Sequence, residues 1–110
     1  MKRPDVGTMM KRACERHILI PAFNIAYLPM MRPVCKTLER LKTFGLAEAA
    51  RPDVEKFGAK SFEAVAAEFR KEANPEFVAL HLDHIPVIDE DRQRVEWEKL
   101  IQTGLDLGFE

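Results

Sequence analysis

The chain has 110 residues, which corresponds to at most one domain of ordinary size. Its composition, with 46% apolar and 32% charged residues, is typical of a globular protein rather than a disordered one. The net charge of -1 provides no overall positive field for nucleic acid or an anionic membrane, and no apolar run approaches the roughly 20 residues that span a bilayer, so we expect neither as a partner.

The first two expected elements are a short helix and a strand. Thr8 is a suitable N-cap for a helix over residues 9–16, whose apolar residues fall on one side. Residues 18–24 are apolar and partly β-branched, which predicts a strand that ends at the polar side chain of Asn24. Because Pro21 cannot donate to a ladder, we expect a bulge or poor pairing on one side near the middle of this strand.

The middle of the chain predicts a helix, a strand and a second helix. Residues 29–42 carry apolar side chains at helical spacing. We interpret residues 43–51 as a strand because they lie between two helices, although their alanines favour a helix by propensity. Residues 51–60 are expected to form a polar connection. Ser61 then caps a helix over residues 62–73, whose charges match the helix dipole.

The last third predicts one more strand and one more helix. Residues 77–84 begin as an apolar run of strand-like length and end in titratable side chains. After a loop, Asp89 or Asp91 can cap a helix over about residues 91–106, and Gly108 is a suitable stop signal. This helix is expected to bury four apolar side chains: Trp97, Leu100, Ile101 and Leu105.

The order of elements predicts an α/β fold with a parallel sheet. After the first helix, a strand and a helix alternate three times, and such alternation is typical of parallel strands with helical crossovers. A spacing of about 30 residues per strand–helix unit suits a (β/α) barrel or a doubly wound sheet. Three parallel strands leave open edges, so we expect residues 1–110 to be the amino-terminal part of a longer domain and only marginally stable alone.

The candidate site is the end of the third strand. Residues two apart in a strand share a face, so His81 and Asp83 are expected to point together and away from Leu80 and Leu82. His84 follows at the strand end. A neutral imidazole is a good ligand for zinc or a similar metal, and a neighbouring carboxylate can act as an acid or base. Polar residues at a strand end are also often only solvated, so spacing alone leaves both interpretations open.

Other chemically active side chains are given structural roles. Cys14 and Cys35 fall on apolar helix faces and are expected to be buried thiols in a reducing cytosol. With no secretion signal after the first residues, we expect a cytoplasmic protein. His17 is interpreted as a partner of a helix dipole. Five charged residues are interpreted as a solvated loop: Glu48, Arg51, Asp53, Glu55 and Lys56.

Two motifs carry a resemblance to a known family. Residues 20–24 read IPAFN and residues 79–84 read ALHLDH. In this order, they resemble the first and third strands of the class II (zinc-dependent) ketose-bisphosphate aldolases. Residues 104–110, GLDLGFE, resemble the approach to the fourth strand of that family. The likeness spans nearly all of this chain but less than half of a complete aldolase.

The resemblance implies a fold and a reaction. The fold would be a TIM barrel, of which this chain supplies about the first three strand–helix units and an amino-terminal helix. The reaction would be the cleavage or formation of a ketose 1,6-bisphosphate, a step of carbohydrate metabolism, with dihydroxyacetone phosphate and glyceraldehyde 3-phosphate as products. The partner would be a sugar bisphosphate, the cofactor Zn²⁺ or another divalent metal, and the complete protein a homo-oligomer.

The resemblance also implies site residues. His84 would be one of three histidine ligands to the metal, and Asp83 would donate and accept the proton at the C4 hydroxyl or the aldehyde oxygen. Asn24 would lie near bound substrate, and His81 would have a supporting role. Because zinc catalysis normally needs three protein ligands, this chain alone should be inactive.

The chain departs from the family pattern in two places. Glu48 and Arg51 stand near the end of the second strand, where the family usually has a small polar residue, and the loop after His84 is longer than usual. These differences point to a divergent branch. Two alternatives stay open: a non-catalytic α/β module completed by a partner or a second copy, and a metal-dependent barrel hydrolase.

Overall fold

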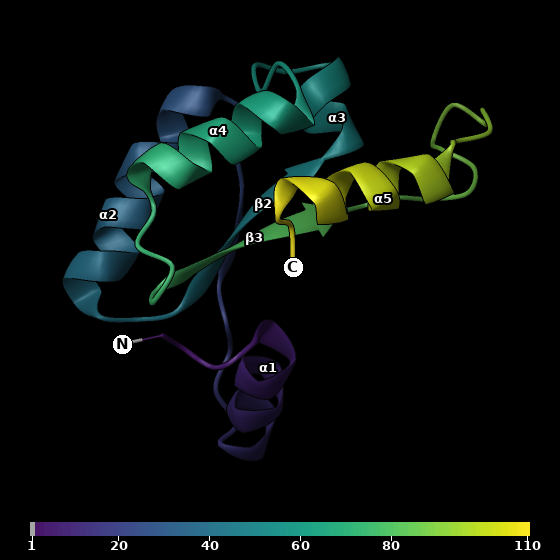
Figure 1. Ribbon diagram of the computed structural model, residues 1–110. Coiled ribbons are helices and arrows are strands. Elements are labelled where there is room, and N and C mark those ends of the chain that lie inside the picture. Colours follow the sequence, from purple (N-terminus) through teal and green to yellow (C-terminus); the bar gives the residue numbers. More distant parts are fainter. Residues whose placement is uncertain (1) are drawn as a thin grey trace.

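The computed structural model describes residues 2–110 as a three-stranded parallel sheet packed against helices (Figure 1). In chain order the elements are α1 (Val6–Glu15), β1 (Ala22–Asn24), the 3₁₀ turn η1 (Leu28–Met30), α2 (Met31–Leu41), β2 (Gly45–Ala50), α3 (Arg51–Glu55), α4 (Phe62–Glu72), β3 (Val78–Asp83) and α5 (Trp97–Leu107). The α/β class and the parallel sheet predicted from the alternation are confirmed.

The strands lie in the order β1-β2-β3, with a helical crossover between each neighbouring pair. The register pairs Asn24 with Glu48 and Glu48 with His81. Since paired residues of parallel strands point to the same side, these three side chains form one row across the sheet. Within residues 2–110 the sheet has three strands and is not a closed barrel, so the barrel remains a prediction.

The core lies between one face of the sheet and the helices α2 and α4 (Figure 1). Alternate strand residues such as Ala49 and Leu80 meet buried side chains such as Cys35 and Val65 there. Each fully buried Leu or Val contributes on the order of 1.5–3 kcal/mol. At the end of α5 the Phe109 ring packs edge-on against Phe62, with centroids 6.1 Å apart.

The first helix and the first strand differ from the prediction. Helix α1 begins at Val6 because Asp5 is its N-cap, and the Asp5 carboxylate accepts the Thr8 N–H. Of residues 18–24, only Ala22–Asn24 form strand β1. Pro21 immediately precedes the strand and contributes only its carbonyl oxygen, which accepts the Leu46 N–H at 2.9 Å.

The final helix begins six residues later than predicted. Asp89 does not cap a helix, because its carboxylate accepts the N–H groups of Asp91 and Gln93 and thereby holds a turn. Helix α5 therefore begins at Trp97. Of the four apolar side chains predicted to be buried, Trp97 and Leu100 are half-buried and Ile101 and Leu105 are exposed. Gly108 adopts the left-handed conformation and ends the helix as predicted.

The structure also tests the predictions for the start of α4, the polar connection before it and the two cysteines. Ser61 caps α4 as predicted, since its hydroxyl oxygen accepts the Ala64 N–H at 3.0 Å. The polar connection contains the short helix α3. Cys35 is buried as predicted, but the prediction is wrong for Cys14, which is exposed on α1, a helix with no buried residue. No helix within residues 2–110 is both long and apolar enough to cross a bilayer.

Candidate functional site

The polar face of the sheet is the side opposite the helices α2 and α4, and four side chains define it here: Asn24, Glu48, His81 and Asp83. The other face carries Leu80 and Leu82, which pack in or against the core. All four polar residues lie in the carboxyl halves of their strands. In parallel sheets, ligands bind beside this end of the strands, so the polar face is the natural place for a site.

Three members of the polar face form a compact cluster, which we call the acid–histidine cluster: Glu48, His81 and Asp83. One potential ligand atom from each lies within 4.8 Å of the other two. Nε2 of His81 is 4.0 Å from Oε1 of Glu48. The residue Glu48 is only 9% exposed, whereas Asp83 and His81 are half-buried. Strand pairing brings Glu48 and His81 together as register partners, and Asp83 lies two residues further along the same face of β3.

Burial perturbs the cluster electrostatically. It raises the pKa of the Glu48 carboxyl group above its ordinary value, and the negative charge and hydrogen bond of Asp83 raise it further. Positive charge on His81 opposes both effects.

His84 lies beside this cluster without being part of it. Its side chain is 80% exposed, and its Nε2 atom is 3.6 Å from Oδ2 of Asp83. The backbone of His84 has φ 49°, in the left-handed region that costs a non-glycine residue on the order of 1–3 kcal/mol. This conformation turns the chain sharply at the end of β3, and the imidazole remains accessible to a ligand.

Asn24 is held at the end of β1 by a buried carboxylate. Its Nδ2 atom donates to Oδ2 of Asp53 at 3.1 Å, and the same oxygen accepts the N–H of Ala50 at 2.9 Å. Asp53 thus joins the ends of β1 and β2. The side-chain amide of Asn24 is directed toward this joint, while the residue itself is exposed.

The loops after β2 and β3 are tied to each other. The Arg51 guanidinium lies 3.0 Å from the Glu55 carboxylate and 3.5 Å from that of Asp89. Nearby, Lys56 pairs with Glu90 at 2.9 Å. These ion pairs hold the long loop after β3 against α3, next to the carboxyl end of the sheet.

The family model of class-II fructose-bisphosphate aldolase matches residues 5–109. The chain belongs to this family. No curated protein matches it. The matched range includes every residue of the polar face together with His84, so the geometry described above is that of an aldolase-family chain.

The donor set of this aldolase-family chain fits a divalent metal in its chemistry. Zinc takes histidine nitrogens and carboxylate oxygens as ligands, and both kinds are present at the end of β3. His84 is accessible, and the acid–histidine cluster lies next to it. The residues therefore suit the class of metal that the family implies.

The sequence analysis missed two residues of this site. Glu48 and Asp53 were interpreted as parts of a solvated loop, and that interpretation is wrong, because both are buried. A signal for Glu48 was present: it is the one charged residue in the strand sequence GLAEAA. A charge in a strand of small apolar residues needs a partner, and here the partners are Asp83 and His81.

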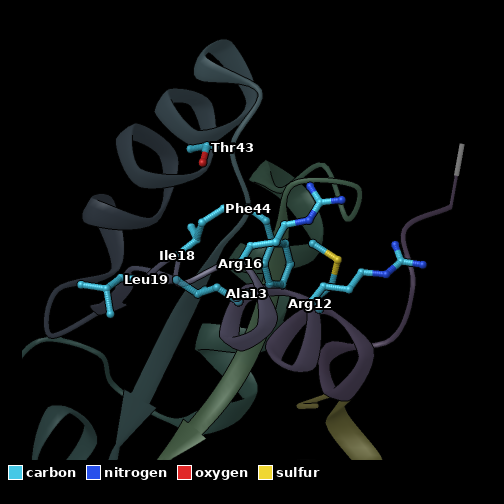
Figure 2. A pocket seen from close by; sticks show the side chains of 9 residues that line it. Arg12, Ala13, Arg16, Ile18, Leu19, Thr43 and Phe44 are labelled. Atoms are coloured by element: carbon cyan, nitrogen blue, oxygen red, sulfur yellow. The ribbon is translucent and has the colours of Figure 1, made fainter.

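A separate hollow of about 270 Å³ lies at the opposite end of the sheet (Figure 2). It is located between α1 and the segments that precede β1 and β2, with Ile18 and Phe44 in its lining and Arg12 and Arg16 beside it. The amino ends of barrel strands usually serve stability rather than catalysis. We therefore assign the hollow no part in the site.

Proposed function

We propose that the protein containing this chain catalyses the metal-dependent, reversible cleavage of a ketose 1,6-bisphosphate to dihydroxyacetone phosphate and glyceraldehyde 3-phosphate. Residues 2–110 would supply the first three strand–helix units and the amino-terminal helix of its TIM barrel. The observation that carries the proposal is the family match over residues 5–109, which includes the strand end with Asp83 and His84. A cytoplasmic location and a homo-oligomeric state remain predictions.

Asp83 is assigned the proton transfer. In the cleavage direction its carboxylate accepts the proton of the C4 hydroxyl while the C3–C4 bond breaks, and the electron pair of that bond moves toward the C2 carbonyl. In the reverse direction the carboxylic acid returns the proton to the aldehyde oxygen. A positioned acid or base of this kind typically contributes 10²–10⁴-fold. The half-buried position of Asp83 supports the role, because the group is both held and reachable.

His84 is assigned to the metal, with its exposed imidazole as one ligand. A bound divalent metal supplies positive charge that stabilises the negative charge developing on the ketose oxygens. Asn24 is assigned a substrate contact at the end of β1, and its bond to Asp53 would fix the orientation of the amide. His81 is assigned a supporting role beside Glu48.

The test is an assay of the protein that contains this chain with fructose 1,6-bisphosphate and tagatose 1,6-bisphosphate. Cleavage should be abolished by a chelator and restored by zinc or another divalent cation. Asp83→Ala should lower kcat by about 10²–10⁴-fold. Glu63→Ala, at an exposed position of α4, is the control and should retain full activity. Full activity in Asp83→Ala would remove this residue from the mechanism, and hydrolysis in place of carbon–carbon cleavage would favour a barrel hydrolase.

A second candidate function is that of a non-catalytic association module. It is favoured by the outer edge of β1, which has no strand partner within residues 2–110, and by the exposed apolar side chains of Ile18, Leu19 and Phe23 nearby. Sedimentation of the 110-residue chain tests it. A stable complex of defined size would support association, and a monomer with a cooperative thermal transition would contradict it.

A further inference from the structure

We propose that Glu48 is a positioning residue, which holds the side chain of Asp83 in place through a hydrogen bond between the two carboxyl groups. The inference rests on the proposed function only for what Asp83 does. The positioning itself is a statement about two side chains of this chain, and it can be tested whether or not the protein is an aldolase.

Strand geometry places the two groups. Glu48 is the register partner of His81, and Asp83 lies two residues further along β3 on the same face. The Glu48 side chain thus begins one row below Asp83 and is long enough to reach it. The ligand atoms of Glu48, His81 and Asp83 lie within 4.8 Å of one another, so a small movement of either side chain lets a protonated Glu48 carboxyl group donate to the Asp83 carboxylate.

Burial explains why Glu48 is restricted to this contact. Glu48 is 9% exposed, so its side chain has little access to solvent. Taking a carboxyl group out of water is costly unless it is hydrogen-bonded. Within residues 2–110, no buried side-chain nitrogen or oxygen lacks a hydrogen-bond partner. The available partners of Glu48 are the other members of the acid–histidine cluster.

Asp83 needs such a contact more than most strand residues. It is the last residue of β3 and is followed by the left-handed turn at His84, so no further strand residue packs beside it. Its side chain is 25% exposed and lies 3.6 Å from the exposed imidazole of His84, so without Glu48 it can rotate toward solvent. Because a displacement of about 1 Å can cost 10²-fold in rate, a catalytic acid benefits from a fixed neighbour.

Two substitutions of similar volume separate positioning from packing. Glu48→Met fills a similar space without a hydrogen-bonding group, and the Asp83 side chain, which is 25% exposed, can still be solvated after the change. Glu48→Gln retains a group whose amide can donate to the Asp83 carboxylate. Glu72→Met is the matched control, because Glu72 is a buried acid on α4 away from the polar face.

The first readout is the conformation of Asp83 in crystal structures of the protein that contains this chain. We expect one side-chain conformer of Asp83, bonded to residue 48, in the wild type and in Glu48→Gln. We expect a different conformer or several in Glu48→Met, and no change in Glu72→Met. An unchanged single conformer of Asp83 in Glu48→Met would overturn the inference.

The second readout is the division of the effect between kcat and KM. Glu48→Met should lower kcat by about 10-fold or more with little change in KM, and Glu48→Gln should recover most of the loss. Equal activity in Glu48→Met and the wild type would overturn the inference. A protein with the expected Asp83 conformers but without aldolase activity would instead contradict the proposed function and leave the positioning intact.

Discussion

The two faces of β2 and β3 carry different side chains, although residues alternate between the faces one by one. One face presents Ala49, Leu80 and their neighbours to the helices α2 and α4. The other presents Glu48, His81 and Asp83. On the first face nearly every atom is apolar and packed. On the second, a buried carboxyl group is tolerated because other titratable groups surround it.

Together with the proposed function, this difference predicts a division between stability and chemistry within single strands. Each neighbouring pair, such as Leu80 and His81 or Leu82 and Asp83, contributes one residue to each face. Substitutions on the helix side should therefore change the free energy of unfolding. Substitutions on the polar face should change the reaction and have smaller effects on stability.

The largest effect on stability is expected from Leu80→Ala. Leu80 is 2% exposed in the core, and removing a buried leucine side chain typically costs 2–5 kcal/mol. Urea denaturation measures this loss, while kcat per folded molecule should stay at the wild-type value. Leu105→Ala is the control, since Leu105 is 62% exposed and should change the free energy of unfolding by less than about 0.5 kcal/mol. A large fall in kcat in a fully folded Leu80→Ala variant would show that the helix-side face also contributes to the reaction, contrary to the proposed division.

The fold was predictable from the sequence where local patterns and global topology agree. Alternating strands and helices predict the parallel sheet, and Ser61 predicts the start of α4. The prediction failed where one side chain competes for the backbone: Asp89 holds a turn in place of a helical start. It also failed at residues 18–21, which were predicted to be part of the first strand but precede β1. Their apolar composition suggests burial, but it does not show whether a neighbouring strand pairs with them.

The candidate site was predictable only in part. The alternation places His81 and Asp83 on one face, and the structure places them so. Glu48 was missed because its role depends on the register between β2 and β3, which no local pattern contains. Asp53 was missed for a related reason: its partners, Asn24 and Ala50, are at the ends of two different strands. The roles of both Glu48 and Asp53 therefore depend on contacts between elements that are distant in sequence.

A smaller effect is expected from Asp53→Ala, which would test whether the ends of β1 and β2 depend on each other. The change leaves the buried N–H of Ala50 without its acceptor, while the amide of the exposed Asn24 can bond to water instead, and one unsatisfied buried group costs about 1–3 kcal/mol. The free energy of unfolding should fall by at least that amount, and the Ala50 amide should exchange its hydrogen faster. Glu63→Ala, at an exposed site, should do neither. An unchanged exchange rate at Ala50 would contradict the role of Asp53.

A pH-dependent effect is expected on the helix side. Burial raises the pKa of the Cys35 thiol from 9.0 to about 11, so the folded state keeps this proton at pH values at which the unfolded state loses it. The resulting stability is present below pH 9 and is lost as the pH rises toward 11, by up to about 3 kcal/mol at 1.36 kcal/mol per unit. The difference in free energy of unfolding between the wild type and Cys35→Ala should therefore shrink from pH 8 to pH 10.5. Cys14→Ala, at an exposed cysteine, should follow the wild type throughout.

The smallest effect is expected at the amino end of the sheet, where an apolar hollow adjoins two exposed arginines (Figure 2). If chemistry is confined to the carboxyl end, the double substitution of Arg12 and Arg16 by alanine should leave kcat and KM unchanged. Because both side chains are exposed, each substitution should change the free energy of unfolding by less than about 0.5 kcal/mol. The same assay used for Asp83→Ala checks this. A loss of activity in the double variant would place a functional surface at the amino end, and the confinement of chemistry to the carboxyl end of the sheet would then be wrong.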